Sequence, residues 1–441
     1  MSLTPLQPWI MKKLGCQAAE FDRCTLEEIQ LKRLRAVFDY ARLRSPFYRE
    51  LYAALPAEFN TFKDFSRFPF TSAEDIRINP LRFVCVSQEE IHRIVTLPTS
   101  GTTGQPKRIF FTEADQALTI DFFGVGMSTL VEKGDQVLIL LPCERPGSVG
   151  DLLATALKQT DCVPFKFGPF PNEREVLDFI VQNHINVLVG APVQLQRLAC
   201  KDEQDGILPR GVLRSVLSST DVLSEAIRAH LTRVWGCKVF DHYGMTETGL
   251  GGGVECDACS GYHMRDADLY YEIIDPITGR NVIEGEEGEV VVTTLTRVAM
   301  PLIRYRTGDL SRRLSGICPC GSFITRLAPI KRRLGSGRQV VEDVIYQDLL
   351  DEALFQIKEM ADFEVLLGKN GSRDCLTIVA GTFAPISNDD LAMKTLRSLQ
   401  QIPAVKKAAA ALEVQIEIRK LNQEIGKYPF VFKKRQILDQ R

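Results

Sequence analysis

The sequence lacks the features that mark membrane, secreted or nucleic-acid-binding proteins. In its 441 residues no apolar run reaches the roughly 18 residues of a membrane-spanning helix. The net charge is −2 and no basic block exceeds three residues, which argues against a nucleic-acid footprint. The first residues lack the charged and apolar regions of a secretory signal. We therefore expect a cytoplasmic protein that binds neither membrane nor nucleic acid.

Histidine is scarce and cysteine is dispersed. The five histidines form no Ser-His-Asp grouping that calls for nucleophilic catalysis. The twelve cysteines are scattered through a long chain, which is typical of reduced cytosolic thiols together with one metal site. Apolar residues at 45% and charged residues at 25% are ordinary for a globular enzyme, and the length predicts two or more domains.

Helical and extended patterns alternate through the middle of the chain, after a mostly helical and irregular N-terminal region. The periodicity predicts helices over 113–131, 151–159, 173–183, 193–199 and 224–235. It predicts strands over 136–141, 162–167, 186–190, 213–217 and 238–240. This alternation is typical of an α/β fold with a doubly wound, mostly parallel sheet, whose ligands bind beyond the carboxyl ends of its strands.

The pattern changes twice in the second half. After residue 261, strands predicted over 270–274, 288–294 and 310–314 are separated by turns, which indicates an antiparallel or β-barrel-like subregion. Beyond residue 330 the sequence predicts a small α+β domain with helices over 342–356 and 388–401 and strands over 363–367, 376–380 and 412–419. We therefore predict a large N-terminal domain over 1–329 and a C-terminal domain over 330–441.

The most informative segment is Leu97-Pro-Thr-Ser-Gly-Thr-Thr-Gly-Gln-Pro-Lys107, which lies between two extended runs. Its glycines let the backbone approach a ligand, and its hydroxyls, amides and ammonium suit phosphate. The candidate ligands are Thr99, Ser100, Gly101, Thr102, Thr103, Gly104 and Lys107. The segment is no Walker A loop, because the lysine leads into a β-rich run instead of a helix. A hairpin turn without a ligand is the simpler alternative.

This segment resembles the phosphate loop of the adenylate-forming superfamily, which includes acyl-CoA synthetases, peptide-synthetase adenylation domains and luciferase. In a second stretch, which begins at Asp241, residues 243–247 match the family's Tyr-Gly-x-Thr-Glu motif. The match implies that Thr246 meets the α-phosphate of ATP and that Glu247 helps to hold Mg²⁺. The other residues that it places against the nucleotide are Asp241, His242, Tyr243, Gly244 and Met245.

Two further motifs extend the resemblance. The family's Arg-Thr-Gly-Asp matches residues 306–309 and implies that Asp309 accepts hydrogen bonds from the ribose, although Thr-Gly-Asp could equally be a turn. A second ribose contact is implied at Arg333 or Arg326, in a hinge stretch that lacks the family's glycine and acidic residues. Near the C-terminus, Glu424-Ile-Gly-Lys427 resembles the motif whose lysine bridges the attacking carboxylate and the α-phosphate.

A weaker match lies at Ser218-Ser-Thr-Asp221, where relatives have a Gly-Glu pair near adenine. Thr220 and Asp221 either contact the nucleotide or cap the following helix at its N-terminus. The cap is the simpler interpretation, because hydroxyl and carboxylate side chains are favoured there.

A candidate metal site is independent of the nucleotide. Cys256, Cys259 and His263 lie close together in the sequence and are followed by Cys318 and Cys320. Zinc takes four thiolate or imidazole ligands in a tetrahedron, so five candidates compete for four places. Many phenylacetate–CoA ligases have a similar spacing, which matches all except Cys259 and leaves that cysteine as the alternative. Such a site would be structural; unmetallated thiols are the other interpretation.

Together the motifs resemble the phenylacetate–CoA ligase-like branch of the superfamily. The resemblance implies an acid–thiol ligase that adenylates a carboxylic acid, of aryl or arylacetic type, and transfers it to coenzyme A as the C-terminal domain rotates as a mobile lid. It implies ATP, AMP, Mg²⁺ and coenzyme A as cofactors, together with a structural zinc ion. A homodimer is a further expectation. Two alternatives stay open. In the first, the acyl group passes to the thiol of a carrier protein or another protein instead of coenzyme A. In the second, the chain binds nucleotide without acyl transfer.

Overall fold

The computed structural model describes residues 2–56, 58–97, 106–170, 172–409, 411–421 and 435–441. Within these ranges, none of the helices combines the length and the apolar character needed to cross a bilayer. The chain divides into two compact units. The first unit comprises residues 1–129, 155–160 and 242–330, and the second comprises 130–154, 161–241 and 331–441. The predicted division into domains 1–329 and 330–441 stays a prediction.

The second unit contains a parallel sheet with the strand order β4-β3-β5-β6-β7. Its strands are β3 (Gln136–Ile139), β4 (Val163–Lys166), β5 (Val187–Gly190), β6 (Ser215–Ser218) and β7 (Lys238–Tyr243). Strands β4 and β5 lie on opposite sides of β3, so the sheet is doubly wound. Every residue of β5 and β6 is buried, as expected for parallel strands covered on both faces. The predicted α/β fold class is confirmed.

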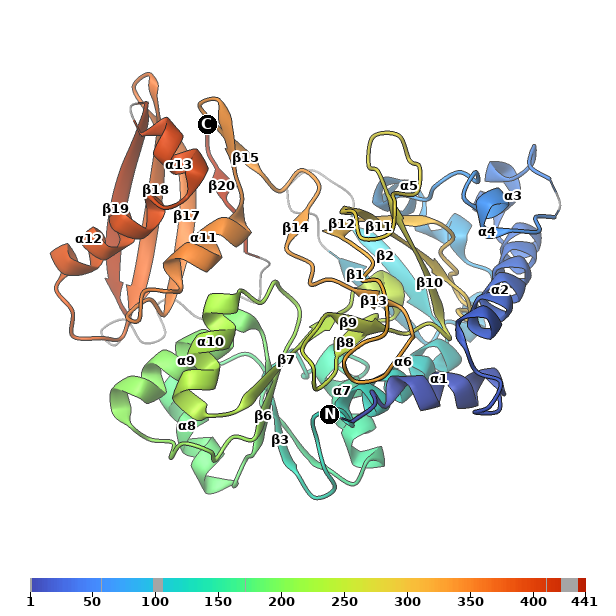
Figure 1. Ribbon diagram of the computed structural model, residues 1–441, viewed down its shortest axis with the longest axis horizontal. Helices are drawn as coiled ribbons and strands as arrows, with labels where there is room; N and C mark the ends of the chain where they lie inside the picture. Colours follow the sequence, from blue (N-terminus) through green and yellow to red (C-terminus); the bar gives the residue numbers. More distant parts are fainter. Residues whose placement is uncertain (1, 57, 98–105, 171, 410, 422–434) are drawn as a thin grey trace. The chain divides into compact units, whose positions relative to one another are not determined.

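The helices of this sheet begin and end on recognisable capping residues. They are α7 (Val149–Gln159), α8 (Glu173–Gln182), α9 (Pro192–Asp205) and α10 (Glu225–Trp235). The division between the units falls within α7. Helices α8, α9 and α10 cover one face of the sheet (Figure 1). Gly206 and Gly236 end α9 and α10 with left-handed backbones, at φ 64° and 68°. Ser224 caps α10 by accepting a hydrogen bond from Ile227 N at 3.2 Å. The predicted cap at Thr220 or Asp221 is therefore wrong, because the helix begins later.

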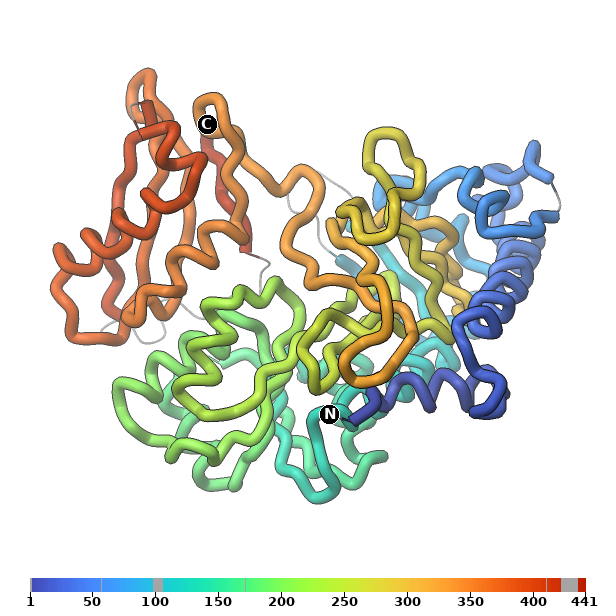
Figure 2. The backbone as a smooth tube through the Cα atoms, viewed as in Figure 1, coloured from blue at the N-terminus to red at the C-terminus, as the bar shows by residue number. Residues whose placement is uncertain are grey.

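A second sheet of this unit has the order β19-β18-β17-β20. Its strands are β17 (Asp362–Asn370), β18 (Arg373–Thr382), β19 (Leu412–Lys420) and β20 (Leu438–Asp439). Helices α12 (Asn388–Leu399) and α13 (Pro403–Ala408) lie on one face of it (Figure 1). The backbone trace shows β17 and β18 as a long hairpin (Figure 2).

The helix predicted over 342–356 is only partly correct. The structure has β14 (Arg332–Arg333), β15 (Arg338–Val340), β16 (Asp343–Ile345) and then α11 (Gln347–Leu354). Strands β15 and β16 pair as a hairpin. The β-branched side chains of Val344 and Ile345 suit an extended backbone, which explains why the helix begins after them.

The first unit packs helices and antiparallel strands around an aromatic core. Its N-terminal elements are α1 (Leu6–Leu14), α2 (Arg23–Arg44), α3 (Pro46–Leu51), α4 (Phe62–Phe65), α5 (Ala73–Ile78), η1 (Pro80–Phe83), η2 (Gln88–Glu90), β1 (Arg93–Leu97), β2 (Lys107–Phe111) and α6 (Glu113–Met127). Later elements are η3 (Thr246–Thr248), β8 (Gly253–Glu255), β9 (Tyr262–Met264), β10 (Leu269–Ile274), β11 (Gly288–Thr294), β12 (Tyr305–Ser311) and β13 (Arg326–Leu327). Buried rings such as Phe38, Tyr48 and Phe65 fill its core.

The strand predicted over 310–314 lies earlier in the structure. Strand β12 begins at Tyr305 and pairs with β11, so the Thr-Gly-Asp stretch is extended and the turn interpretation is wrong. Gly308 has a φ of 76°, and the register shifts opposite it, between Glu289 and Val291. A bulge of this kind accommodates residues that are typical of turns, such as Gly308, and sets the direction of the Asp309 side chain.

Candidate active site

Two predicted motifs meet at a cluster of Lys107, Glu247 and Tyr305, and Tyr305 directly precedes the third motif. Lys107 is the last residue of the predicted phosphate loop and the first of β2, and its ammonium donates to the Glu247 carboxylate. Tyr305 Oη donates to Glu247 Oε1 at 2.9 Å, and Lys107 Nζ lies 3.3 Å from the same hydroxyl. Tyr305 was not among the predicted site residues, since an aromatic residue beside an arginine carries no signal of its own in the sequence.

The charges of this cluster are balanced out of solvent. The side chains of Lys107 and Glu247 are 13% and 6% exposed. Burial alone would raise the pKa of the Glu247 carboxyl, but the charge and hydrogen bond of Lys107 outweigh it and hold that pKa below its ordinary value. The Glu247 carboxylate is therefore ionised at neutral pH, and ionised carboxylate oxygens are the type of ligand that Mg²⁺ prefers.

The turn that carries Glu247 depends on a close backbone approach at Gly244. A Cβ on Gly244 would lie 2.2 Å from the carbonyl oxygen of Leu250, so only glycine fits. Met245 follows, and Thr246 begins the turn η3. His242 precedes them on β7, with its ring centroid 6.1 Å from that of Phe122.

The second and third motifs are joined directly by Tyr243 and Asp309. Tyr243 Oη donates to Asp309 Oδ2 at 3.0 Å, and Asp309 N donates to Thr307 Oγ1 at 3.0 Å. Burial, reinforced by the charge of Asp309, raises the pKa of the Tyr243 phenol far above its ordinary value. Tyr243 therefore remains a hydrogen-bond donor and fixes the carboxylate that is predicted to bind ribose.

Three predicted residues of the second unit lie at one edge of the parallel sheet. Asp241 is buried and lies opposite Ser218 in the register of β7 and β6. Thr220, with a φ of 78°, and Asp221 follow β6 at the same carboxyl edge. Asp221 Oδ2 accepts a hydrogen bond from Arg435 N at 3.1 Å. The edge is where a doubly wound sheet binds ligands.

Several predicted residues are not placed in this cluster. Those outside the described residues are Thr99, Ser100, Gly101, Thr102, Thr103, Gly104 and Lys427. The Arg326 guanidinium donates to the carbonyl oxygens of Ser260 at 3.0 Å and Ser315 at 3.3 Å. Arg333 lies in β14 of the second unit. The ribose contacts of the two arginines stay predictions.

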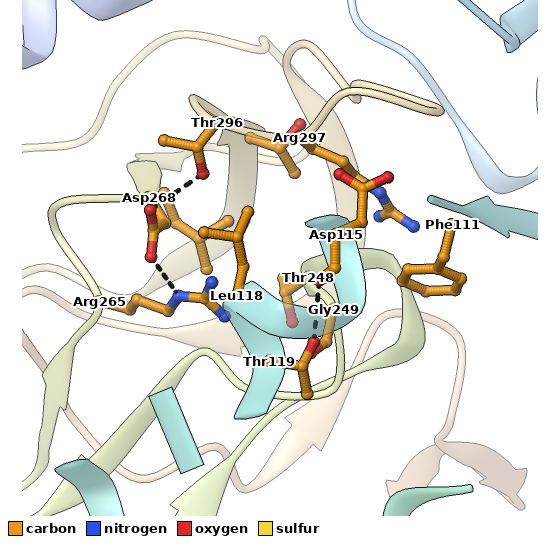
Figure 3. Close-up of a pocket in the computed structure, with 12 residues that line it drawn as sticks. Phe111, Asp115, Leu118, Thr119, Thr248, Gly249, Arg265, Asp268, Thr296 and Arg297 are labelled. Carbon is orange, nitrogen blue, oxygen red and sulfur yellow. Dashed lines mark hydrogen bonds and ion pairs between the residues drawn. The ribbon is translucent and has the colours of Figure 1, made fainter. Parts of the chain in front are cut away.

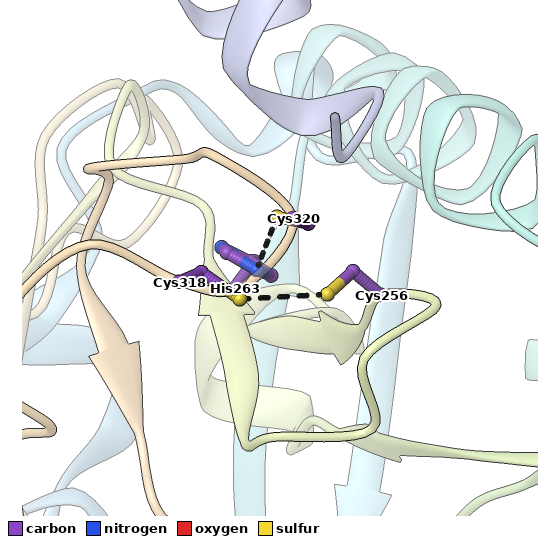
Figure 4. A group of neighbouring side chains, drawn as sticks. All are labelled: Cys256, His263, Cys318 and Cys320. Carbon is purple, nitrogen blue, oxygen red and sulfur yellow. Dashed lines mark hydrogen bonds between the residues drawn. The ribbon is translucent and has the colours of Figure 1, made fainter. Parts of the chain in front are cut away.

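Four of the five predicted metal ligands converge in the first unit (Figure 4). Cys256 follows β8, His263 lies in β9, and Cys318 and Cys320 lie in one turn. Their ligand atoms all lie within 4.8 Å of one another, and all four residues are buried. Cys256 Sγ is 3.7 Å from Cys318 Sγ, and Cys320 Sγ is 3.5 Å from His263 Nε2. Cys259 is outside this group.

A small cavity lies beside the turn that carries Glu247 (Figure 3). Its charged lining residues are Asp115, Arg265, Asp268 and Arg297. The space open to water-sized molecules is about 20 Å³, which suffices for one water but not for a substrate. The sequence patterns did not single out these four residues, since isolated charges are ordinarily solvated.

Comparison with known proteins identifies the family. The AMP-binding enzyme family matches residues 48–297, more than half of the chain. The chain belongs to the AMP-binding enzyme family. A phenylacetate-coenzyme A ligase of Thermus thermophilus is 30% identical over 364 residues, which cover 79% of this chain and 80% of that protein. A phenylacetate-coenzyme A ligase of Pseudomonas putida is 28% identical, covering 80% and 81%.

The fold of this AMP-binding enzyme is also found in a solved structure. A 2-hydroxyisobutyryl-CoA ligase in complex with 2-HIB-AMP matches it with a TM-score of 0.79 and 22% identity, covering 96% of this chain and 91% of that one. The predicted place in the phenylacetate–CoA ligase-like branch of the adenylate-forming superfamily is confirmed. The predicted activity is confirmed as well. The chain is an AMP-forming acid–thiol ligase that adenylates a carboxylic acid with ATP and then forms a thioester with coenzyme A.

Proposed function

We propose that the acid is an aryl or arylacetic acid and that the cluster of Lys107, Glu247 and Tyr305 is the phosphate-facing part of the active site. The observation that carries the proposal is one buried, charge-balanced group that joins Lys107 of the predicted phosphate loop, Glu247 of the second motif and Tyr305, which directly precedes the third motif. The names of the curated relatives, phenylacetate-coenzyme A ligases, support the class of acid.

In this proposal the nucleotide is held from both ends. Lys107, together with the hydroxyls and amides of residues 99–104, binds the β- and γ-phosphates as a point charge beside a row of neutral donors. Asp309 accepts hydrogen bonds from the ribose, and Tyr243 orients that carboxylate from 3.0 Å. Contacts of Asp241 and Asp221 with the nucleotide stay predictions from the sequence.

Glu247 would hold Mg²⁺, because an ionised, buried carboxylate beside phosphates suits a hard cation. When bound, Mg²⁺ neutralises charge that develops on the phosphates. In the structure Lys107 compensates the charge of Glu247.

The first reaction step is attack of the substrate carboxylate on the α-phosphate, with pyrophosphate as the leaving group. Thr246 donates to the α-phosphate, and Lys427 stabilises the charge shared by the attacking and transferring oxygens. In the second step the thiol of coenzyme A attacks the acyl carbon and AMP leaves. The lysine departs before this step by rotation of the C-terminal domain, as the family resemblance implies.

We also propose that Cys256, His263, Cys318 and Cys320 hold a structural zinc ion. Zinc with bonds of about 2.3 Å to two thiolates in a tetrahedron separates their sulfur atoms by about 3.8 Å. The Cys256–Cys318 distance of 3.7 Å fits this value and is far too long for a disulfide. Four protein ligands leave no open position, so the ion would brace β8, β9 and the turn over 318–320 instead of binding substrate.

Removal of this metal is expected to destabilise the first unit. The Cys318→Ser variant should lose about one zinc per chain and show a Tm lowered by about 10 °C, because a structural zinc site contributes directly to folding. Metal analysis and thermal unfolding measure both effects. Cys259→Ser is the matched control, since it removes a nearby thiol outside the group. Equal zinc content in wild type and Cys318→Ser would contradict the proposal.

The function itself is tested by ATP–pyrophosphate exchange with a panel of aryl, arylacetic, fatty and amino acids. We expect exchange with an aryl or arylacetic acid and formation of a thioester when coenzyme A is added. Exchange without a thioester would indicate a protein thiol as acceptor, and exchange only with aliphatic acids would overturn the assigned class. A homodimer and a cytoplasmic location stay predictions from the sequence.

A further inference from the structure

Arg297 connects two segments that carry residues of the Lys107–Glu247–Tyr305 cluster. Its Nη1 donates to the backbone carbonyl of Glu247 at 2.7 Å, and its Nη2 donates to the carbonyl of Phe110 at 3.3 Å. Phe110 lies on β2, the strand that begins with Lys107. One guanidinium therefore spans the turn η3 and the strand β2, which lie far apart in the sequence.

The Arg297 side chain is itself held rigidly. It is 6% exposed, and its guanidinium carbon lies 4.2 Å from the centroid of the Phe111 ring. Burial lowers the pKa of Arg297 to about 10, so the group stays charged at neutral pH. Among the described residues its Nε has no hydrogen-bond partner. A buried donor without a partner costs free energy, and the hydrogen bonds of Nη1 and Nη2 offset this cost.

Asp115 fixes the backbone from which Arg297 extends. Its carboxylate accepts hydrogen bonds from Val298 N at 2.8 Å and Ala299 N at 3.0 Å. Asp115 is also tied into the capping box that starts α6, where it accepts from Thr112 N at 2.9 Å. The figure shows its carboxylate beside the Arg297 guanidinium (Figure 3). The base and the tip of Arg297 are therefore both immobilised.

We propose that Arg297 is a positioning residue that sets the place of the Glu247 carboxylate relative to Lys107, through the main chain of both segments. This inference depends on the proposed role of Glu247 in holding Mg²⁺. A ligand held by its own hydrogen-bonded backbone needs no rearrangement when the cation arrives, and loss of such outer partners typically weakens metal binding about 10- to 100-fold.

The test compares Arg297→Met and Arg297→Lys with Arg265→Met. Arg265 is the matched control, because it is 3% exposed and lines the same cavity but bonds to Asp268 at 2.7 Å instead of to η3. Calorimetry measures the Kd of ATP in buffers with and without magnesium chloride. We expect the Mg²⁺-dependent gain in affinity for ATP to fall about tenfold in Arg297→Met. It should fall less in Arg297→Lys, because lysine keeps the positive charge but lacks the two donors of the planar guanidinium. Arg265→Met should lower the Tm and keep the gain.

Three results would overturn the proposal. They are an unchanged Mg²⁺ gain in Arg297→Met, an equal loss in Arg265→Met, and wild-type ATP binding that is indifferent to Mg²⁺. If Arg297→Met does not fold, Arg297→Lys decides, and a full Mg²⁺ gain in that variant counts against the proposal. The measurement uses no acid, so a failed acid panel and a failed role for Arg297 are distinguished.

Discussion

The Lys427→Ala variant is expected to lose about 100- to 1000-fold of its acid-dependent ATP–pyrophosphate exchange and to bind ATP nearly as well as the wild type. The ammonium is needed where charge develops between the attacking carboxylate and the α-phosphate, so its loss affects the adenylation step more than ground-state binding. Exchange at saturating ATP gives the rate, and calorimetry gives the Kd of ATP.

The control for this variant is Lys420→Ala. Lys420 ends β19 and donates to the carbonyl of Ile386, so its removal takes away a positive charge that is close to Lys427 in the sequence and has no assigned part in the reaction. Exchange by this control should be unchanged. Normal ATP–pyrophosphate exchange by the Lys427 variant would contradict the role assigned to that lysine. Equal losses of exchange in both variants would indicate a general effect of charge.

The Glu247→Gln variant is expected to lose about 100-fold of its exchange rate and to require more Mg²⁺ for half-maximal activity. The amide keeps the shape of the carboxylate and accepts from Tyr305, but it supplies no charge to a cation. Lys107, which is 13% exposed, then loses its counter-ion. Because breaking a buried pair leaves an uncompensated charge, we expect a stability loss of about 3 kcal/mol in urea unfolding as well.

Glu272→Gln separates these two effects. Glu272 is buried and pairs with Arg304 through two contacts of 3.0 Å, so its neutralisation breaks a comparable ion pair that is not assigned to the nucleotide. We expect a similar loss of stability with the exchange rate per folded molecule retained. A loss of exchange as large as that of Glu247→Gln would show that Glu247 acts only through the packing of the unit.

Patterns within short stretches of sequence predicted much of the fold. The parallel strands and their helices follow from hydrophobic periodicity, because each element buries one face or two regardless of its distant partners. The predictions failed where a local pattern had two outcomes. Residues 307–309 have the composition of a turn but lie in a bulged strand, and residues 343–345 form a strand ahead of the predicted helix.

The choice among candidate metal ligands shows the same limit. The spacing in the sequence left Cys259 and His263 as competitors, since both follow Cys256 closely. The structure brings His263 into the group because β9 pairs with β8 and carries the imidazole toward the turn at 318–320. Pairing between strands is a long-range event that the spacing of cysteines does not encode.

The family, the order of the nucleotide motifs and the class of reaction could be predicted from the sequence, because each motif is a contiguous stretch and its residue types indicate its chemistry. Which groups face one another is set by the fold. Tyr305 at 2.9 Å from the Glu247 carboxylate and Arg297 at 2.7 Å from the Glu247 carbonyl belong to segments 50 to 58 residues away along the chain. Such contacts are fixed by the packing of buried strands and charges, which close-packed interiors specify only when the whole unit folds.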